Sequence, residues 1–253
     1  MLPADAAEIN VLMYHSISPA TAPTCIAPET FRMQMGMLAE CGYGTVTLSD
    51  FASWRRGERE LPAKTAVITF DDGFADFASA AHPVLRDHGF TATVFLPTSR
   101  MGGAVNWDGD ASQSPLLSWD EIQALAEEGV EFGGHGLSHS DLTGLPPHDM
   151  QNEVRGPKQA IEEKLQRPVA SFAPPYGRST PAIREEIARN YEISLGVRFA
   201  RARRDCDLFD VPRIEMFYYR DATRWRDHLT GRGETYFLAR RFLRGARAAL
   251  MPA

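Results

Sequence analysis

Residues 66–73 read Ala-Val-Ile-Thr-Phe-Asp-Asp-Gly, and this stretch decides how the rest of the chain is interpreted. Its apolar beginning is rich in β-branched residues, which is typical of a buried strand. Asp71 and Asp72 follow where the strand ends, and Gly73 allows a sharp backbone turn. One interpretation is a simple Asp-Gly turn between apolar runs. The other is a functional site, because two buried carboxylates need a metal ion, an arginine or a histidine to hold them.

The bulk composition indicates an ordinary folded protein. The chain has 253 residues, of which 43% are hydrophobic and 24% charged, so a folded protein is expected. The length suits one large α/β barrel domain, with two small domains as the alternative. The net charge of −6 argues against nucleic acid as the main partner. The three cysteines, Cys25, Cys41 and Cys206, are widely spaced and form neither a disulfide framework nor a zinc knuckle.

The N-terminal residues indicate where the protein works. Residues 1–10 contain no basic segment followed by an apolar core, so no secretory signal is visible. We therefore expect a cytoplasmic protein, or an exported one whose leader is absent from this sequence. No run of about eighteen apolar residues predicts a membrane-spanning helix.

Short apolar runs alternate with helical patterns along most of the chain. The expected strands cover residues 10–17, 45–48, 66–70, 91–96, 130–132, 169–172, 193–197 and 211–214. The expected helices cover residues 28–42, 74–88, 118–129, 150–165 and 181–190, and Pro157 should kink the fourth or mark its true start. Seven or eight strands joined by short connections predict an α/β fold, a single parallel β/α barrel. Functional residues of such barrels gather at the carboxyl ends of the strands.

Two histidines form a second candidate site feature. His135 and His139 are four residues apart, a spacing at which two imidazoles on a helical turn share one face. With one carboxylate they would make a two-histidine, one-carboxylate metal site with positions open for water and substrate. The alternative is a chance pair, since the chain has seven histidines. Gly133, Gly134 and Gly136 surround the pair, which indicates unusual torsions or close backbone approach.

Three motifs in order resemble those of a known family. Thr69-Phe-Asp-Asp-Gly73, His135-Gly-Leu-Ser-His139 and Ala173-Pro-Pro-Tyr-Gly177 are similar to the first three motifs of the NodB-homology polysaccharide deacetylases, carbohydrate esterase family 4. The resemblance extends over residues 10–216. It implies a distorted β/α barrel and a hydrolase that uses a divalent metal to remove acetyl groups from N-acetylated sugars or polysaccharides.

The resemblance also implies roles for individual residues. Asp71 would be the catalytic base, and Asp72, His135 and His139 would be the metal ligands. The backbone N–H of Tyr176 would help to hold the oxyanion, and Pro175 and Tyr176 would border the substrate. The metal would most simply be zinc, although imidazole and carboxylate also suit cobalt, nickel and iron.

The chain departs from the usual family pattern in three places. Gly136 follows the first histidine where serine or threonine is usual, and Ala173 stands where an arginine usually steadies the base. No Leu-x-His segment near the C-terminus supplies the usual acid. His15, in Leu-Met-Tyr-His-Ser, resembles the N-terminal histidine of the rearranged exopolysaccharide (poly-N-acetylglucosamine) deacetylase branch. We therefore predict His15 as the acid and Arg213, in Val-Pro-Arg-Ile-Glu, as the cation that orients Asp71.

Two further segments carry expectations about partners. Trp107, in the loop of residues 99–115, could stack on a sugar ring or anchor its loop. We expect residues 1–235 to form the barrel and residues 236–253 a basic amphipathic helix, either part of the same domain or peripheral. Such a helix can make peripheral contact with an anionic membrane. The simpler alternative is a helix packed on the barrel with its arginines in water.

The sequence is therefore compatible with three functions. The first is deacetylation of an N-acetylated glycan. The second is hydrolysis of another amide, a cyclic imide or ureide, which a closed pocket would favour. The third is a non-catalytic glycan-binding protein, suggested by Gly136 and Ala173. The retained Asp71 argues against the third, because a binding protein has little use for a buried base.

Overall fold

The computed structural model describes residues 8–19, 22, 24–106 and 114–250. The strands are β1 (Glu8–Tyr14), β2 (Gly44–Thr45), β3 (Thr65–Phe70), β4 (Thr93–Leu96), β5 (Ala104–Val105), β6 (Ser114–Pro115), β7 (Glu131–Gly134), β8 (Ser171–Phe172), β9 (Ile193–Phe199), β10 (Ala202–Arg203) and β11 (Val211–Glu215). The helices are α1 (Pro28–Glu40), α2 (Leu48–Arg55), α3 (His82–Asp87), α4 (Trp119–Glu127), α5 (Pro147–Leu165), α6 (Pro181–Asn190), α7 (Ala222–Leu229) and α8 (Glu234–Leu250).

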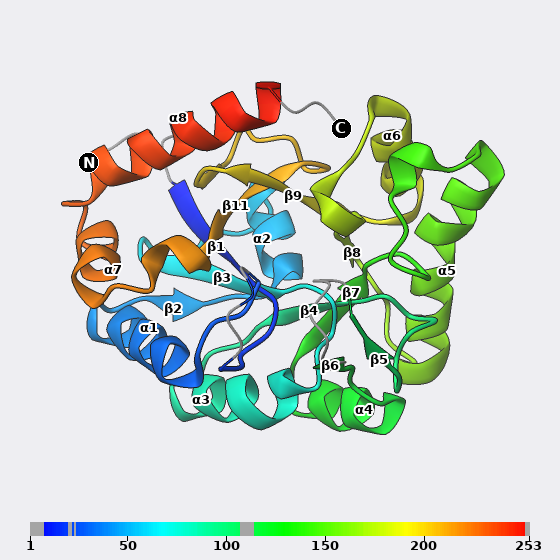
Figure 1. Ribbon diagram of the computed structural model, residues 1–253, viewed down its shortest axis with the longest axis horizontal. Coiled ribbons are helices and arrows are strands. Elements are labelled where there is room, and N and C mark those ends of the chain that lie inside the picture. The colour runs from blue at the N-terminus through cyan, green and yellow to red at the C-terminus, as the bar shows by residue number, and fades with distance from the viewer. Residues whose placement is uncertain (1–7, 20–21, 23, 107–113, 251–253) are drawn as a thin grey trace.

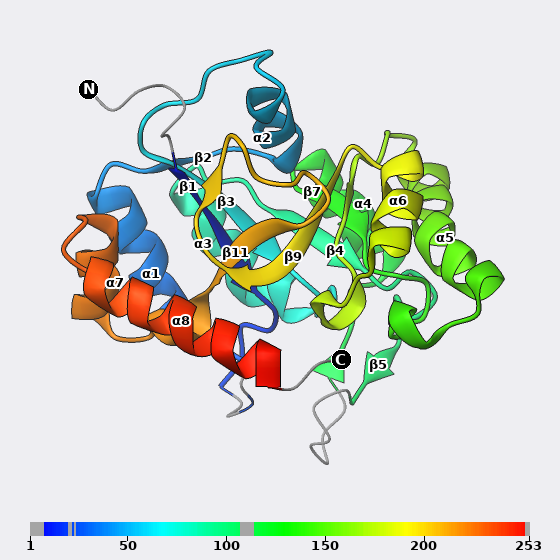
Figure 2. The same ribbon diagram turned by 90° about the horizontal axis from the view of Figure 1, so that it is seen from above.

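The principal sheet closes on itself. β1 pairs in parallel with β11 on one side and with β3 on the other, which joins the two ends of the series β3, β4, β7, β8, β9, β11. The result is the predicted barrel, with seven parallel strands and helices around its outside (Figures 1 and 2). Two short strands extend it: β2 beside β3, and β10 antiparallel to β1.

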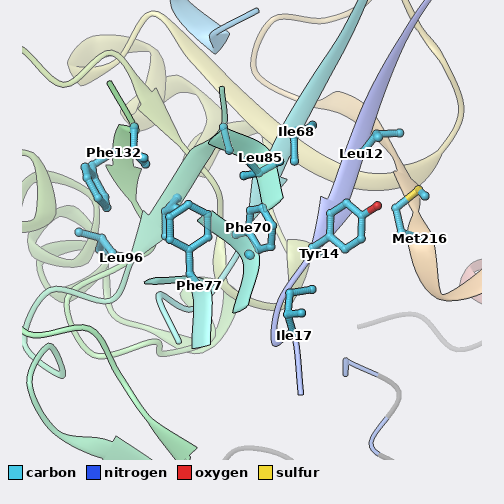
Figure 3. Close-up of a cluster of buried hydrophobic side chains, with 14 of the residues drawn as sticks. Leu12, Tyr14, Ile17, Ile68, Phe70, Phe77, Leu85, Leu96, Phe132 and Met216 are labelled. Carbon is cyan, nitrogen blue, oxygen red and sulfur yellow. The ribbon is translucent and has the colours of Figure 1, made fainter. Parts of the chain in front are cut away.

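An apolar cluster fixes the two strands that lead into the site. Tyr14, the last residue of β1, stacks on Phe70, the last residue of β3, with ring centroids 5.2 Å apart. Phe77 contacts Phe70 edge-on at 4.8 Å (Figure 3). Because these rings are buried and interlocked, the residues that follow them, His15 and Asp71, leave the barrel from fixed positions.

Several predicted boundaries were wrong for local reasons. The strand expected at residues 45–48 is only Gly44–Thr45, because the Thr47 side chain accepts a hydrogen bond from the Asp50 N–H and starts α2. The helix expected at 74–88 contains a π-helical turn at Phe77–Ala81 before α3. Pro83 explains the wider turn, since a proline in a helix lacks the N–H and clashes with the preceding turn.

Further boundaries differ at the first strand and at two helices. β1 ends at Tyr14, so His15 follows the strand. α5 begins at Pro147, so Pro157 does not mark its start; it lies buried within the helix. α7 was not anticipated, although Asp221 accepts a hydrogen bond from the Arg224 N–H and caps it. Within the residues that the structure describes, no helix is long and apolar enough to cross a bilayer.

Candidate metal centre and active site

The two aspartates after β3 face different partners. The Asp71 N–H donates to the Tyr14 carbonyl at 2.9 Å, so this residue continues the pairing of β3 with β1. Asp72 then adopts a left-handed backbone with φ of 73°, and Gly73 follows with φ of 64°. Few residues besides glycine, asparagine and aspartate accept that conformation readily. The turn separates the two carboxylates, so each can serve a different function.

The Asp72 carboxylate meets both histidines of the second motif. Its Oδ1 lies 3.2 Å from His135 Nε2 and 3.1 Å from His139 Nε2. His135 follows β7 directly, where Gly133 allows close packing: a Cβ there would lie 2.6 Å from Phe95. His139 has a left-handed backbone with φ of 65°. All three residues are buried, and one ligand atom from each lies within 4.8 Å of the others.

These donor atoms fit a divalent metal ion. Two ligand atoms bound at about 2.1 Å to a tetrahedral ion stand roughly 3.4 Å apart, close to the observed Nε2–Oδ1 separations. His135 Nδ1 lies 2.6 Å from the Ala173 carbonyl oxygen. A carbonyl only accepts, so Nδ1 must carry the proton and Nε2 is left to bind.

The charges of the three residues are strongly coupled. Burial alone would raise the pKa of Asp72, but the hydrogen bonds from His135 and His139 bring this pKa far below its ordinary value. Burial lowers the pKa of both imidazoles. In His139 that effect prevails and the pKa is lowered, whereas in His135 the hydrogen bond to Asp72 outweighs it and the pKa is raised. The site therefore keeps Asp72 anionic, as a ligand must be.

Asp71 is held by an arginine from the other side of β1. Arg213 Nη1 donates to Oδ1 at 2.7 Å and Nη2 to Oδ2 at 2.8 Å. The Arg213 side chain is buried, and its Nε donates to the Gly196 carbonyl at 2.9 Å. Burial would raise the pKa of Asp71, but the neighbouring Arg213 and then His135 bring it below the ordinary value. The structure thus brings together the two side chains that the sequence hypothesis paired.

The other predicted residues that the structure describes lie near the two carboxylates and the histidine pair. His15 Nε2 is 3.9 Å from Asp71 Oδ2, and the His15 side chain is 17% exposed, so solvent reaches it. Tyr176 has φ of 59°, and its ring contacts His139 edge-on with centroids 4.7 Å apart. Pro175 is buried beside it. Trp107 lies outside the described residues.

A cleft of about 710 Å³ opens beside the metal ligands. His139 and Tyr176 line it, together with Arg100, Asp141 and Arg178. Arg178 donates to Asp141 at 2.5 Å, which closes one side of the cleft with an ion pair. The Tyr176 side chain is 55% exposed there, so the site opens to solvent.

Glu153 is a residue of the site that the sequence interpretation missed. It projects from α5 and accepts from the Leu137 N–H at 2.7 Å, the Ser138 N–H at 3.1 Å and the Ser138 hydroxyl at 2.6 Å. Gly136 has φ of +76°, and a Cβ there would lie 2.8 Å from Glu153 Oε2. The Glu153 carboxylate therefore holds the loop between the two histidines. It can approach this loop because Gly136 has no side chain. The sequence feature that could have identified Glu153 is a glutamate on the apolar face of the expected helix, next to Val154 and one turn from Pro157.

A closed parallel barrel with one carboxylate and two imidazoles at a strand end, and a second carboxylate beside them, is suited to metal-dependent hydrolysis. The chain belongs to the polysaccharide deacetylase family, whose sequence pattern matches residues 58–196. It is accordingly a hydrolase that acts on carbon–nitrogen bonds other than peptide bonds. The match includes the aspartates and the histidine pair, whereas His15 and Arg213 lie outside it.

Relatives of this chain include proteins named as deacetylases. YxkH of Bacillus subtilis (strain 168) is 25% identical over 211 residues, which is 83% of this chain and 72% of YxkH. The poly-β-1,6-N-acetyl-D-glucosamine N-deacetylase of Escherichia coli (strain K12) is 29% identical over 108 residues, 43% of this chain and 13% of that protein.

Solved structures show the same fold. IcaB from Ammonifex degensii superposes with a TM-score of 0.76 at 23% identity, covering 90% of this chain and 98% of that one. The Streptococcus pyogenes deacetylase PplD superposes with a TM-score of 0.72 at 22% identity, covering 82% and 92% respectively.

Proposed function

We propose that this protein removes the N-acetyl group from an N-acetylated sugar or polysaccharide. The single observation that carries the proposal is the pair of carboxylates: Asp72 faces two imidazoles, and Asp71 beside it is held as an anion by Arg213. The Escherichia coli relative is named for acting on a polymer of N-acetylglucosamine. A polymer of that kind is the substrate class that we propose here.

Asp72, His135 and His139 would hold the metal ion, with zinc the first choice. When bound, a divalent ion polarises the amide carbonyl and lowers the pKa of water. Asp71 is placed to take the proton of the attacking water, and its lowered pKa keeps it ready as a base at neutral pH. Arg213 orients the carboxylate through two parallel hydrogen bonds.

His15 and Tyr176 complete the proposed machinery. His15 lies 3.9 Å from the anionic Asp71 and is reached by solvent. It is therefore placed to deliver a proton to the departing amine. The amine then leaves as a neutral group, which needs far less energy than expelling an amide anion. The turn at Tyr176 borders the cleft, and its backbone N–H is our candidate to stabilise the oxyanion.

The open cleft favours a glycan over a cyclic imide or ureide. A small ring substrate would be best held in an enclosed pocket, whereas the cleft beside His139 has an exposed aromatic wall in Tyr176. An aromatic ring at the rim of an open cleft is suited to the apolar face of a sugar.

Acetate release from chitooligosaccharides and from simple N-acetyl sugars tests the proposal. We expect release that stops with a chelator, returns with zinc and is abolished in Asp71→Asn. Stoichiometric metal binding without acetate release would point instead to the imide or the glycan-binding function. Hydrolysis of cyclic imides by the same preparation would decide between those two.

A further inference from the structure

The C-terminal helix α8 turns apolar side chains toward solvent. Leu238, Phe242 and Leu243 are 49%, 75% and 57% exposed, whereas Phe237 is buried against the barrel. Apart from Tyr176 in the cleft, they are the large hydrophobic side chains exposed in the described part of the chain. Leu238 and Phe242 are one helical turn apart, so they form a continuous strip. Figure 2 shows α8 lying across the outside of the barrel.

Two arginines of α8 point the opposite way. The Arg240 guanidinium lies over the rings of Tyr218 and Tyr236, with distances to the centroids of 4.7 and 5.5 Å. Arg244 lies 5.7 Å from the Tyr218 centroid, and its Nη2 is 3.4 Å from the Val197 carbonyl oxygen. The helix is packed on the barrel, as in the simpler expectation, but these two arginines contact barrel residues instead of lying wholly in water. Arg240 and Arg244 thus contact the barrel, whereas the apolar side chains of the strip face solvent.

A cationic groove runs beside this strip. A hollow of about 620 Å³ separates α8 from the end of β9, and four arginines line it: Arg184, Arg198, Arg241 and Arg244. Asp210 is the acidic residue in its lining. Arg184 Nε lies 4.0 Å from Asp207 Oδ2, so that pairing is loose. The groove thus carries a surplus of positive charge in a chain whose net charge is −6.

The cationic groove and the apolar strip are continuous. A second hollow, of about 360 Å³, is lined by Leu238 and Phe242 and shares Arg241 and Gly245 with the first. A ligand that covers both must have an anionic part and an apolar part next to each other. That combination is the chemistry of a lipid with an anionic headgroup.

We propose that the outer face of α8 docks on an anionic lipid bilayer. Arg184, Arg198 and Arg241 would meet lipid phosphates. Leu238, Phe242 and Leu243 would enter the boundary between headgroups and acyl chains. A second copy of the chain is a poorer occupant. Two α8 faces related by a twofold axis would bring their Arg241 side chains toward each other, and like charges in an interface oppose association.

The docked orientation has a consequence for the active site. The groove is also lined by Gly177 and Ser179, which follow Tyr176. A bilayer covering the groove would therefore lie beside the catalytic cleft. If the proposed deacetylase function holds, the acetylated sugar is one presented at a membrane surface; the docking itself does not depend on that function.

Co-sedimentation of the full chain with vesicles tests the proposal. We expect binding to vesicles of phosphatidylcholine mixed with phosphatidylglycerol, weak binding to phosphatidylcholine alone, and loss of binding at high salt. Phe242→Ser and Arg241→Glu should each lower the partition coefficient about tenfold, since the first removes an inserted ring and the second reverses a charge near the surface. Lys164→Glu is the matched control, because it makes the same charge change at an exposed site on α5.

Three outcomes would contradict docking on a bilayer. Equal binding to both kinds of vesicle, or none to either, would overturn the proposal. So would a dimer in solution that Phe242→Ser dissociates, because a second copy would then cover the strip. Acetate release from a soluble oligosaccharide should be unchanged in Phe242→Ser. That assay separates a failure of docking from a failure of the proposed chemistry and reports that the variant is folded.

Discussion

Arg213 and Asp71 form a buried bidentate ion pair across β1, although 142 positions separate them in the sequence. Arg213 comes from β11 and Asp71 follows β3; β1 lies between these two strands in the barrel. Arg213 thus provides a cation of the kind that the family resemblance led us to expect at position 173, where this chain has alanine. Without such a partner, burial raises the pKa of a carboxylate and so disfavours the anion that acts as a base.

Replacing Arg213 should reduce both activity and stability. Arg213→Ala leaves the Asp71 charge buried and unpaired, and breaking a buried pair costs about 3–5 kcal/mol of unfolding free energy. Arg213→Lys keeps the charge but loses the two-pronged geometry, so we expect an intermediate loss. Urea denaturation and the kcat/KM of acetate release measure the two effects.

The control for Arg213 is a surface ion pair. Arg226 binds Glu40 with both side chains exposed, so Arg226→Ala should unfold at nearly the same urea concentration as the wild type. An Arg213→Ala enzyme with the wild-type rate would remove this residue from the mechanism.

His15→Ala should slow turnover without loss of metal. His15 lies 3.9 Å from Asp71 and is not one of the residues clustered around Asp72, so its removal leaves the candidate ligand set intact. Loss of a general acid typically lowers the rate by about 10²–10⁴. Metal content and kcat measured on the same preparation check both parts, with exposed His88→Ala as control. A parallel loss of metal and activity would refute the role as acid.

Glu153→Ala should weaken metal binding. Three hydrogen bonds from Leu137 and Ser138 end on this carboxylate, and they hold the loop that carries His135 and His139. Residues that support metal ligands commonly change affinity by about 10–100-fold. Calorimetric titration of zinc into chelator-treated protein measures the loss.

Two variants identify the cause of that loss. Glu153→Gln keeps an acceptor of the same shape, so it should restore much of the affinity. Glu163→Ala, at an exposed position of the same helix, should bind zinc as the wild type does. Wild-type affinity in Glu153→Ala would show that the loop needs no brace.

The barrel was predictable because its strands are locally apolar and its helices locally capped. The run from Ala66 to Phe70 is buried throughout, and its apolar pattern predicts a strand from the local sequence alone. The candidate metal ligands were also visible as a pair of histidines, but residues 135–139 form a loop and not the helical turn that the spacing predicted. Glu153 was not visible in this way, because its importance depends on a loop that approaches α5 only in the folded barrel.

Two other misses also have physical causes. The stretch from Thr45 to Leu48 alternates like a strand, but only two of its residues have room beside β3 before the Thr47 cap turns the chain. The direction of the α8 arginines depends on Tyr218 and Tyr236, and the tyrosines become neighbours of Arg240 only through packing. Amphipathic pattern alone therefore predicted the helix but not which face is buried.

Metal affinity should fall as the pH is lowered. The ligand imidazoles must be neutral to bind, and in the metal-free protein the pKa of His135 is raised above 6.5 by its hydrogen bond to Asp72, although burial opposes this. Proton competition therefore begins above pH 6.5 and strengthens below it. Each proton displaced on binding changes the apparent Kd about tenfold per pH unit. Zinc titrations on both sides of pH 6.5, with proton release followed by a dye, measure this; a Kd independent of pH would exclude histidine ligation.

His228 should make the fold sensitive to acid independently of the metal site. It is buried, its Nδ1 lies 2.9 Å from the Tyr219 hydroxyl, and its Nε2 lies 3.1 Å from Asn10 Oδ1. Burial, helped by the nearby charge of Arg201, lowers the pKa of His228 from 6.5 to about 3. The unfolded chain therefore takes up this proton first as the pH falls, so the neutral residue stabilises the fold fully above pH 6.5 and progressively less between pH 6.5 and about 3.

The slope of that loss gives a quantitative test. One proton bound only by the unfolded chain removes about 1.4 kcal/mol of unfolding free energy per pH unit, or about 2 kcal/mol between pH 6.5 and pH 5. Urea denaturation across this range should show the loss in the wild type and in His148→Gln, whose side chain is 83% exposed. His228→Gln should be less stable at neutral pH but should lack this part of the slope, because glutamine has no proton to gain. An unchanged slope in His228→Gln would mean that carboxylates, and not this histidine, cause the acid sensitivity.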